Sequence, residues 1–131
     1  MLFIGVLILA SMLNFFNHSK FEKEAADIQR RFNSFEESFI AFKRICEVHF
    51  DPINPQQVIA PGKLHRIKNQ DSCCIWKVEM AVKNLKSNQS PRLWFALKGE
   101  NLAFLCIKTH IDNYDNNEID RIAELRINDI L

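Results

Sequence analysis

The chain has 131 residues, of which 47% are apolar and 25% are charged, and its formal net charge is +1. This length suits one compact domain with its own core, and the high apolar fraction excludes an intrinsically disordered chain. A net charge close to zero gives no overall field that would favour nucleic acid or an anionic membrane.

Several common catalytic and metal-binding motifs are missing from the chain. It has three glycines and lacks a Gly-rich phosphate loop, an HExxH motif and a GxSxG motif, which argues against nucleotide hydrolases and serine hydrolases. Its four cysteines lack the spacing of a zinc site. We expect no metal or cofactor, and we expect the cysteines to be reduced and mostly buried, as in a cytoplasmic protein.

The chain opens with the almost wholly apolar run MLFIGVLILASMLNFF, and its first charged residue is Lys20. A membrane helix needs about 20 apolar residues, so this run is short for one. It also lacks the positive n-region of a secretory signal. We expect no stable membrane association, and an anchor or signal is the minority interpretation.

Two consecutive helices are predicted after this run. Ser19 with Glu22, and then Ser34 with Glu37, repeat the Ser-x-x-Glu pattern of a helix capping box. Apolar residues recur at helical spacing after both patterns, first over about 20–31. The very short joint between them predicts an antiparallel helical hairpin.

A proline-containing loop then leads to a predicted sheet. In CIWKVEMAVKNL the apolar residues alternate, which predicts a strand with one core face and one face that presents cations to solvent. RLWFAL and LAFLCIK, joined by KGEN, predict an antiparallel hairpin. NEIDRIAELRINDIL predicts a C-terminal helix, so the expected fold is α+β with three strands after the helical hairpin.

Three segments together resemble the RelE/ParE superfamily, the small toxins of bacterial type II toxin-antitoxin pairs. SKFEKEAADIQRRFNSFEESFIAF resembles the family's first helical hairpin, and IAPGKL resembles its Gly-containing turn. IWKVEMAVKNLKSNQSPRLWFAL is similar to the family's basic strand, its Lys/Arg-rich loop and the strand that begins with Arg. The resemblance runs from about Leu13 to Arg121 and implies a small twisted antiparallel sheet packed against the N-terminal hairpin, with a C-terminal helix.

The resemblance also implies how the chain begins. Family members have a short strand a few residues before the hairpin, so LNFFNHSK is expected to be that strand. Residues 1–11 would then be an apolar extension of a single domain over 12–131, and Met12 is a candidate for the natural start.

For function, the resemblance implies a toxin of a type II toxin-antitoxin pair. Its target is either mRNA, cut by a metal-independent endoribonuclease (an mRNA interferase) that often works on the ribosome, or DNA gyrase, inhibited as by ParE. A cognate antitoxin protein would neutralise either activity in the cytoplasm. A catalytically weakened relative that acts by protein binding is the remaining alternative.

Cations gather in the part of the chain expected to form the sheet. The segment from Cys74 to His110 contains six Lys and Arg against two Glu, so it carries +4 and the rest of the chain carries −3. RNA cleavage without a metal needs a base, an acid and cations that stabilise the charge on phosphate.

The resemblance assigns the phosphate-binding arginine to Arg92, whose guanidinium fork suits a phosphate. Lys77 and Lys83 are expected on the polar face of the preceding strand, where they can bind phosphate or act as a base. Lys86 and Lys108 are expected to bind RNA phosphates. For each of these cations the alternative is a solvated surface charge.

His110 follows the last predicted strand and is the expected acid or base, because imidazole titrates near neutral pH. His18, His49 and His65 have no motif support and are expected to be surface or capping residues. Active nuclease members often carry a Tyr near the end of the sheet, whereas the single tyrosine here, Tyr114, lies in a polar loop. Either His110 and the lysines suffice, or the enzyme is weakened or inactive.

Overall fold

We describe a computed structural model that covers residues 12–70 and 73–131. The apolar extension expected over residues 1–11 lies outside the described residues. The regular elements are β1 (Asn14–Asn17), α2 (Ser19–Arg31), α3 (Phe35–His49), β2 (Leu64–Gln70), β3 (Cys73–Glu79), β4 (Arg92–Lys98), β5 (Asn101–Lys108) and α4 (Asn116–Ile127), with short 3-10 helices at Pro61–Lys63, Ser87–Gln89 and His110–Asp112.

The strands form a five-stranded sheet in the order β1-β5-β4-β3-β2. Strands β2 to β5 are antiparallel neighbours, whereas β1 pairs in parallel with β5. The α+β class is therefore confirmed, and the sheet is mixed rather than purely antiparallel. The β4-β5 hairpin also matches the prediction, with Gly99 in its turn at φ +60°, a conformation that L side chains rarely adopt.

The sheet has one strand more than the sequence pattern predicted, because β2 was not recognised. Its sequence LHRIKNQ has few apolar residues, and a β-bulge between Arg66 and Lys68 interrupts the two-residue period. The neighbouring strand is shorter than expected and ends at Glu79 instead of continuing to Leu85. Asn84 in the following loop has a φ of 75°, which is incompatible with a strand.

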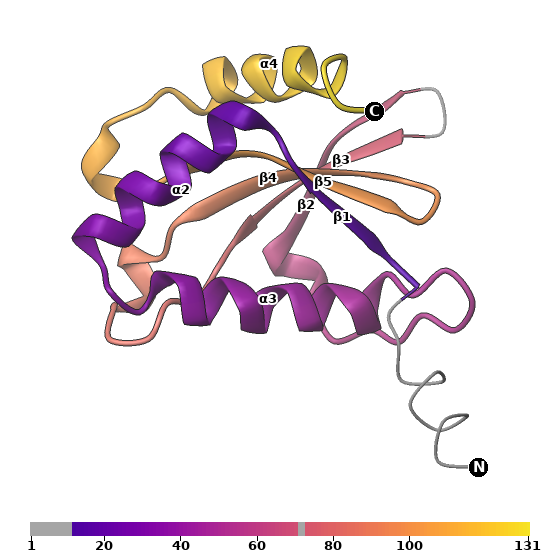
Figure 1. Cartoon of the computed structure of the whole chain (residues 1–131), viewed down its shortest axis with the longest axis horizontal. Helices are drawn as coiled ribbons and strands as arrows, with labels where there is room; N and C mark the ends of the chain where they lie inside the picture. Colours follow the sequence, from indigo (N-terminus) through magenta and orange to yellow (C-terminus); the bar gives the residue numbers. More distant parts are fainter. Residues whose placement is uncertain (1–11, 71–72) are drawn as a thin grey trace.

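Helices cover both faces of the sheet (Figure 1). Residues of α2 and α3 share one buried cluster with one face, and α4 shares a second buried cluster with the other. The prediction that one face of β3 presents its side chains to solvent is therefore wrong. Ile75, on that face, is fully buried in the cluster that contains Ile119 and Ala123 of α4.

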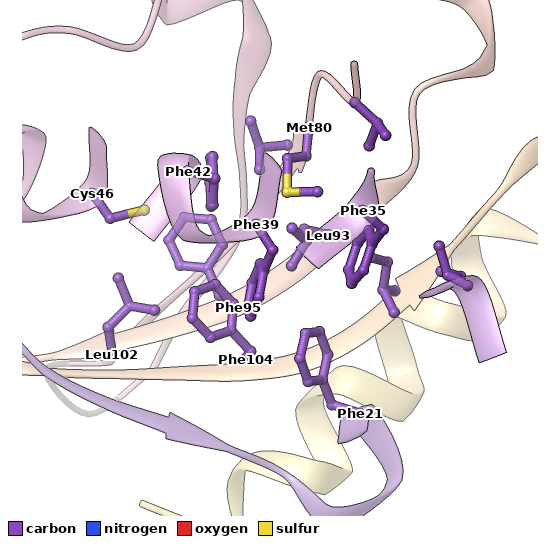
Figure 2. Packing of buried hydrophobic residues seen from close by; sticks show 14 of the residues in the cluster. Phe21, Phe35, Phe39, Phe42, Cys46, Met80, Leu93, Phe95, Leu102 and Phe104 are labelled. Atoms are coloured by element: carbon purple, nitrogen blue, oxygen red, sulfur yellow. The ribbon is translucent and has the colours of Figure 1, made fainter. Parts of the chain in front are cut away.

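Phenylalanines dominate the cluster beneath α2 and α3, and Phe104 of β5 lies at its centre (Figure 2). The Phe104 ring is fully buried, and its centroid is 4.8 Å from that of Phe39 and 5.5 Å from that of Phe21. Both partners lie on the apolar stripes of their helices, so the stripes predicted from helical spacing are the faces that pack on the sheet.

The two predicted helices are present, but their starts differ from the expected capping boxes. His18 caps α2, because its Nδ1 accepts the N–H of Lys20 at 3.1 Å, and Ser19 is the first helical residue. Ser34 does occupy the residue before α3, but its hydroxyl donates to the carbonyl of Lys83 at 2.6 Å. Sequence spacing therefore located both helices, but not the capping contacts: α2 is capped by the preceding His18, and Ser34 bonds to a distant loop.

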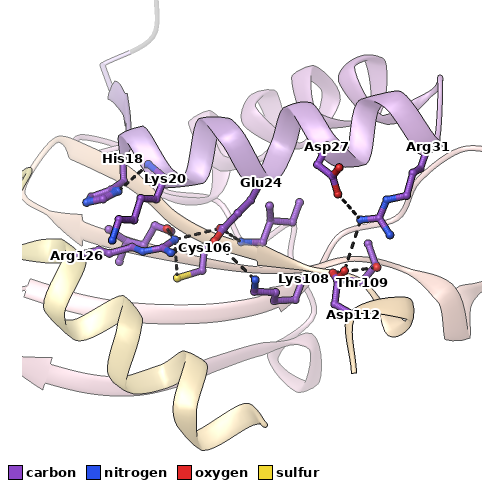
Figure 3. Close-up of polar contacts among 12 residues, drawn as sticks. His18, Lys20, Glu24, Asp27, Arg31, Cys106, Lys108, Thr109, Asp112 and Arg126 are labelled. Carbon is purple, nitrogen blue, oxygen red and sulfur yellow. Dashed lines mark hydrogen bonds and ion pairs between the residues drawn. The ribbon is translucent and has the colours of Figure 1, made fainter. Parts of the chain in front are cut away.

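Beyond the end of β1, side chains of α2 and α4 bind the backbone of β5 (Figure 3). Glu24 of α2 accepts the N–H of Ile107 at 3.2 Å, and Arg126 of α4 donates to the carbonyl of Leu105 at 2.7 Å. Arg126 and Glu24 also bind each other at 2.9 Å. This pair joins helices from opposite faces around the sheet edge and satisfies backbone groups that an edge strand leaves open.

All four cysteines are free, and Cys46, Cys73 and Cys106 are buried, as expected. Burial raises the pKa of the Cys106 thiol to about 12, although the nearby Arg126 lowers it. Within residues 12–70 and 73–131, none of the helices combines the length and apolar character needed to cross a membrane.

Candidate functional site

A hollow with a volume of about 460 Å³ opens on the α4 side of the sheet. Strands β2, β3 and β4 and helix α4 each contribute to its wall. The lining residues are His65, Arg66, Ile67, Lys77, Arg92 and Asp120.

Strand register brings the side chains of this wall together. Lys77 lies opposite His65 on one side and opposite Trp94 on the other, while Glu79 lies opposite Arg92. Directly opposed residues project from the same face of a sheet, and residues two apart on one strand do so as well. His65, Lys77 and Arg92 therefore share the face that α4 partly covers.

Arg66 also lines the hollow, but its charge points elsewhere. Its guanidinium carbon lies 5.4 Å from the centroid of the Trp76 ring, and Trp76 packs against the cluster beneath α3. The Arg66 guanidinium is thus on the opposite side of the sheet from Lys77. The cations that belong to the hollow are those of Lys77 and Arg92.

Arg92 is held by residues of two other elements. Its Nη1 donates to Oδ1 of Asn116 at 2.7 Å, and its Nη2 donates to Oε1 of Glu79 at 3.1 Å. Its side chain is 27% exposed, so a ligand can reach the guanidinium. An anion that binds there must compete with the carboxylate of Glu79.

Lys77 is also paired with a carboxylate. Its Nζ lies 3.4 Å from Oδ1 of Asp120, and the same oxygen accepts the indole N–H of Trp94 at 2.7 Å. Lys77 is 17% exposed and Asp120 is 22% exposed. Asp120 of α4 therefore holds the lysine and the tryptophan together beneath the helix.

Tyr114 reaches this region from the loop before α4. Its ring packs edge-on against Trp94, with centroids 5.8 Å apart. Burial raises the pKa of the Tyr114 phenol, while the charge and hydrogen bond of Arg92 lower it and the charge of Glu79 raises it. A tyrosine thus lies next to Arg92, although in the sequence it belongs to a polar loop well beyond the last strand.

The other predicted site residues lie away from the hollow. Lys83 is in the loop after β3, not on the strand, and its N–H donates to Ser38 of α3 at 3.1 Å. Lys86, in the same loop, precedes a 3-10 helix and is exposed. Both lysines therefore lie in a loop that is attached to α3, on the opposite side of the sheet from α4.

The last two predicted residues lie near the end of β5. Lys108 is opposite Arg92 in the strand register, but its Nζ lies 3.7 Å from Glu24 of α2 (Figure 3). His110 begins the exposed 3-10 helix that follows Thr109. The structure thus brings together Lys77 and Arg92 from the predicted set, and places Lys83, Lys86, Lys108 and His110 elsewhere.

Sequence reasoning missed His65, Tyr114 and Asp120 as residues of this site. His65 belongs to the strand that the pattern did not reveal, and recognising that strand would have placed it beside Lys77. Tyr114 and Asp120 come from the C-terminal loop and helix, and no local signal relates them to β3 or β4.

The hollow combines anion-binding cations with a group that can transfer protons. A guanidinium and an ammonium can stabilise phosphate oxygens, and an imidazole can accept or donate a proton. Among residues 12–70 and 73–131, no group of three or more His, Cys, Asp or Glu is arranged to hold a metal ion.

A second hollow of about 440 Å³ adjoins His49 and Trp76 between the end of α3 and β2. Nδ1 of His49 accepts the N–H groups of Val58 and Ile59, both at 3.2 Å, and burial lowers the pKa of its imidazole. His49 thus attaches the loop after α3 to the helix. We assign it a structural role.

Comparison of the chain with protein-family models, with curated proteins and with solved structures gave no match in any of the three.

Proposed function

We propose that this protein is a toxin of a type II toxin-antitoxin pair, and that it binds and cleaves mRNA without a metal at the α4-side hollow. The observation that carries the proposal is the shared placement of Lys77, Arg92 and His65 on one sheet face around that hollow. Tyr114 lies beside Arg92. It is a candidate for the tyrosine that active family members often carry near the end of the sheet and that this sequence lacks there.

The proposal includes a RelE/ParE-like arrangement of the fold. It is supported by the order of the elements, in which a short strand precedes two helices, four antiparallel strands and a C-terminal helix. The N-terminal helices pack together on one face of the sheet, as the resemblance implies. The parallel pairing of β1 with β5 is compatible with this order, because the two helices return the chain across the sheet.

In the proposed reaction Arg92 binds the oxygens of the scissile phosphate and Lys77 contributes a second positive charge. Both residues stabilise the negative charge that develops on phosphorus when the 2′-hydroxyl oxygen attacks. RNA must first exchange with Glu79 and Asp120, the present partners of these cations. Exchange at Arg92 is feasible because its partner Glu79 is 53% exposed, and an exposed ion pair contributes about 1 kcal/mol or less. Lys77 and Asp120 are 17% and 22% exposed, so their pair is more shielded from water and harder to displace.

A second candidate function follows from the same pairing. Because Arg92 and Lys77 already have carboxylate partners, the hollow can instead be a structural network in a toxin that acts by protein binding. DNA gyrase, the target of ParE-type toxins, is then the candidate partner. A cognate antitoxin would bind the toxin in either case, and a small reading frame adjacent to the gene would support both versions.

Controlled expression of the wild type and of Arg92→Gln tests the proposal. The wild type should stop growth and degrade mRNA, and Arg92→Gln should leave messages intact. Arg30→Gln is a matched control, because Arg30 is an exposed arginine of α2 that pairs with Asp27 of the same helix. RNA sequencing after induction provides the measurement.

The same experiment distinguishes the alternatives. Growth arrest with intact messages and a DNA damage response would favour gyrase inhibition over RNA cleavage. A wild type that neither slows growth nor alters messages would exclude both candidate functions.

A further inference from the structure

We propose that His65 is the base that removes the proton of the attacking 2′-hydroxyl group in the α4-side hollow, an inference that rests on the proposed ribonuclease function. The sequence pattern assigned this role to His110. The geometry points to His65 because it lies on the same sheet face as Lys77 and Arg92 and lines the same hollow.

The separation between His65 and Arg92 suits a phosphate and its adjacent ribose. His65 lies on β2 and Arg92 on β4, with β3 between them. On β3, His65 is opposite Lys77 and Arg92 is opposite Glu79, so the two residues are offset by two positions along the strands. Strands are about 4.8 Å apart and residues rise about 3.3 Å along them, so the two Cα atoms are separated by about 12 Å. The two side chains can therefore approach one nucleotide from opposite sides, with Lys77 between them.

His65 is also the polar side chain of this wall that is free to react. Lys77 is paired with Asp120, and Arg92 with Glu79 and Asn116. Within residues 12–70 and 73–131, the imidazole of His65 has neither a hydrogen bond nor an ion pair. A proton-transfer group must be available to the substrate, whereas a structural histidine such as His18 uses both ring nitrogens in contacts with Lys20 and Asp129.

Charged groups from several elements surround His65. Lys77 is its neighbour on β3, Arg92 lies beyond Lys77 on β4, and Lys63 precedes its strand. Asp120 of α4 is the carboxylate of the lining, and it is already paired with Lys77. The two cations on β3 and β4 can hold the phosphate while the imidazole of His65 contacts the 2′-hydroxyl group.

In the proposed reaction, His65 starts the attack of the ribose on the phosphate. The imidazole takes the proton from the 2′-hydroxyl group, the O2′–P bond forms and the P–O5′ bond breaks. The departing O5′ takes a proton from water, and the hydroxide that remains takes the proton from the imidazolium. The products are a 2′,3′-cyclic phosphate, a 5′-hydroxyl end and the neutral imidazole. Removal of a general base typically reduces the rate by about 100-fold to 10,000-fold.

The test compares binding with cleavage for wild type and His65→Gln. An oligonucleotide with 2′-deoxyribose at the cleavage position serves as an uncleavable ligand, and NMR follows the imidazole C–H resonances together with the side chain signals of Lys77 and Arg92. We expect the ligand to shift all three and His65→Gln to bind it within about twofold of the wild type. Single-turnover cleavage of the matching RNA should fall by at least about 100-fold and lose the dependence on pH that general-base catalysis gives the wild type.

The other outcomes separate the role of His65 from the ribonuclease function. Binding that shifts Lys77 and Arg92, with wild-type cleavage in His65→Gln, would overturn the role of His65 and leave the ribonuclease function intact. A pH dependence that persists in His65→Gln but disappears in His110→Gln would also overturn it. If RNA is neither bound nor cleaved by the wild type, the ribonuclease function itself fails.

Discussion

Asp120 forms an ion pair with Lys77 in the wall of the hollow. One of its oxygens lies 3.4 Å from the ammonium of Lys77 and accepts the indole N–H of Trp94 at 2.7 Å. The carboxylate therefore makes a hydrogen bond to Trp94 and an ion pair with Lys77. A substitution that removes its charge but keeps its oxygen separates the two contacts.

Asp120→Asn should strengthen RNA binding if Lys77 contacts phosphate. The amide oxygen can still accept the Trp94 N–H, whereas Lys77 loses the charge that neutralises it. We expect affinity for the uncleavable oligonucleotide to rise by at least about threefold, because even an exposed competing ion pair is worth up to about 1 kcal/mol and this pair is more shielded. The slope of log affinity against log salt concentration should also become steeper, by the amount that one additional phosphate contact gives. Fluorescence anisotropy at several salt concentrations measures both, and an unchanged slope would show that Lys77 stays out of the interface.

His49 should make the stability of the fold depend on pH. Burial lowers the pKa of its imidazole from the ordinary value of 6.5, and its Nδ1 accepts two backbone N–H groups only while that nitrogen is unprotonated. The unfolded chain thus binds a proton at His49 more readily than the folded chain does. This contribution to stability is present above pH 6.5 and is lost as the pH falls through the lower folded-state pKa.

The matched variant is His49→Asn, whose side chain oxygen can accept the same N–H groups without titrating. Urea unfolding at pH 7 and pH 5 should show a smaller loss of stability for His49→Asn than for the wild type. Equal losses in the two proteins would mean that His49 does not contribute to the acid sensitivity.

At the level of elements, the edge of β5 depends on α2 and α4. Strand β1 pairs with residues 101–104 of β5, and Glu24 and Arg126 bind the backbone of the residues that follow. The side chains of Glu24 and Arg126 are 18% and 12% exposed, so their pairing is largely shielded from water.

Arg126→Leu should destabilise the protein by about 2–4 kcal/mol, because it leaves Glu24 without its main partner and the Leu105 carbonyl without its donor. The double variant Glu24→Leu/Arg126→Leu should recover part of this loss, since it removes the unpaired carboxylate as well. Chemical denaturation of the single and double variants measures the coupling. Strictly additive losses would indicate that the pair is energetically independent.

Arg30→Leu provides a surface comparison within the same chain. Arg30 and Asp27 are 72% and 54% exposed, so their ion pair is worth about 1 kcal/mol or less. A loss for Arg30→Leu as large as that for Arg126→Leu would contradict the assigned role of burial at the β5 edge.

At the scale of the whole molecule, the phenylalanine cluster connects β5 to both N-terminal helices. Phe104 contributes from the sheet and packs against Phe21 of α2 and Phe39 of α3 (Figure 2). Phe21 and Phe104 are 83 positions apart in the sequence, so their contact exists only in the folded chain.

Phe104→Ala should lower the free energy of unfolding by about 3–5 kcal/mol, through lost burial and the cavity that remains. Phe16→Ala is the matched control, because Phe16 is 41% exposed on β1 and its truncation should change stability much less. Thermal and urea unfolding of both variants provide the measurement. Similar losses for the two variants would show that the core does not centre on Phe104.

Local patterns predicted most of the elements. The apolar stripes of α2, α3 and α4 reflect burial of one helix face, and the continuous apolar runs of β4 and β5 reflect burial on both faces of the sheet. The strand β2 escaped detection because it is polar and contains a bulge. The choice of N-cap also could not be made locally, since Ser34 donates to Lys83 of a distant loop.

Sequence patterns alone predicted the α+β class and the positions of the main helices and hairpin, and they named Lys77 and Arg92 among the candidate site residues. Which charges meet depends on the tertiary structure. Arg92 and Asn116 are 24 residues apart and Glu24 and Arg126 are 102 residues apart, so the sheet register and helix packing bring them together. Periodicity is a local property of the chain, whereas the partner of a charged side chain, and thus the composition of the candidate site, depends on contacts between distant segments.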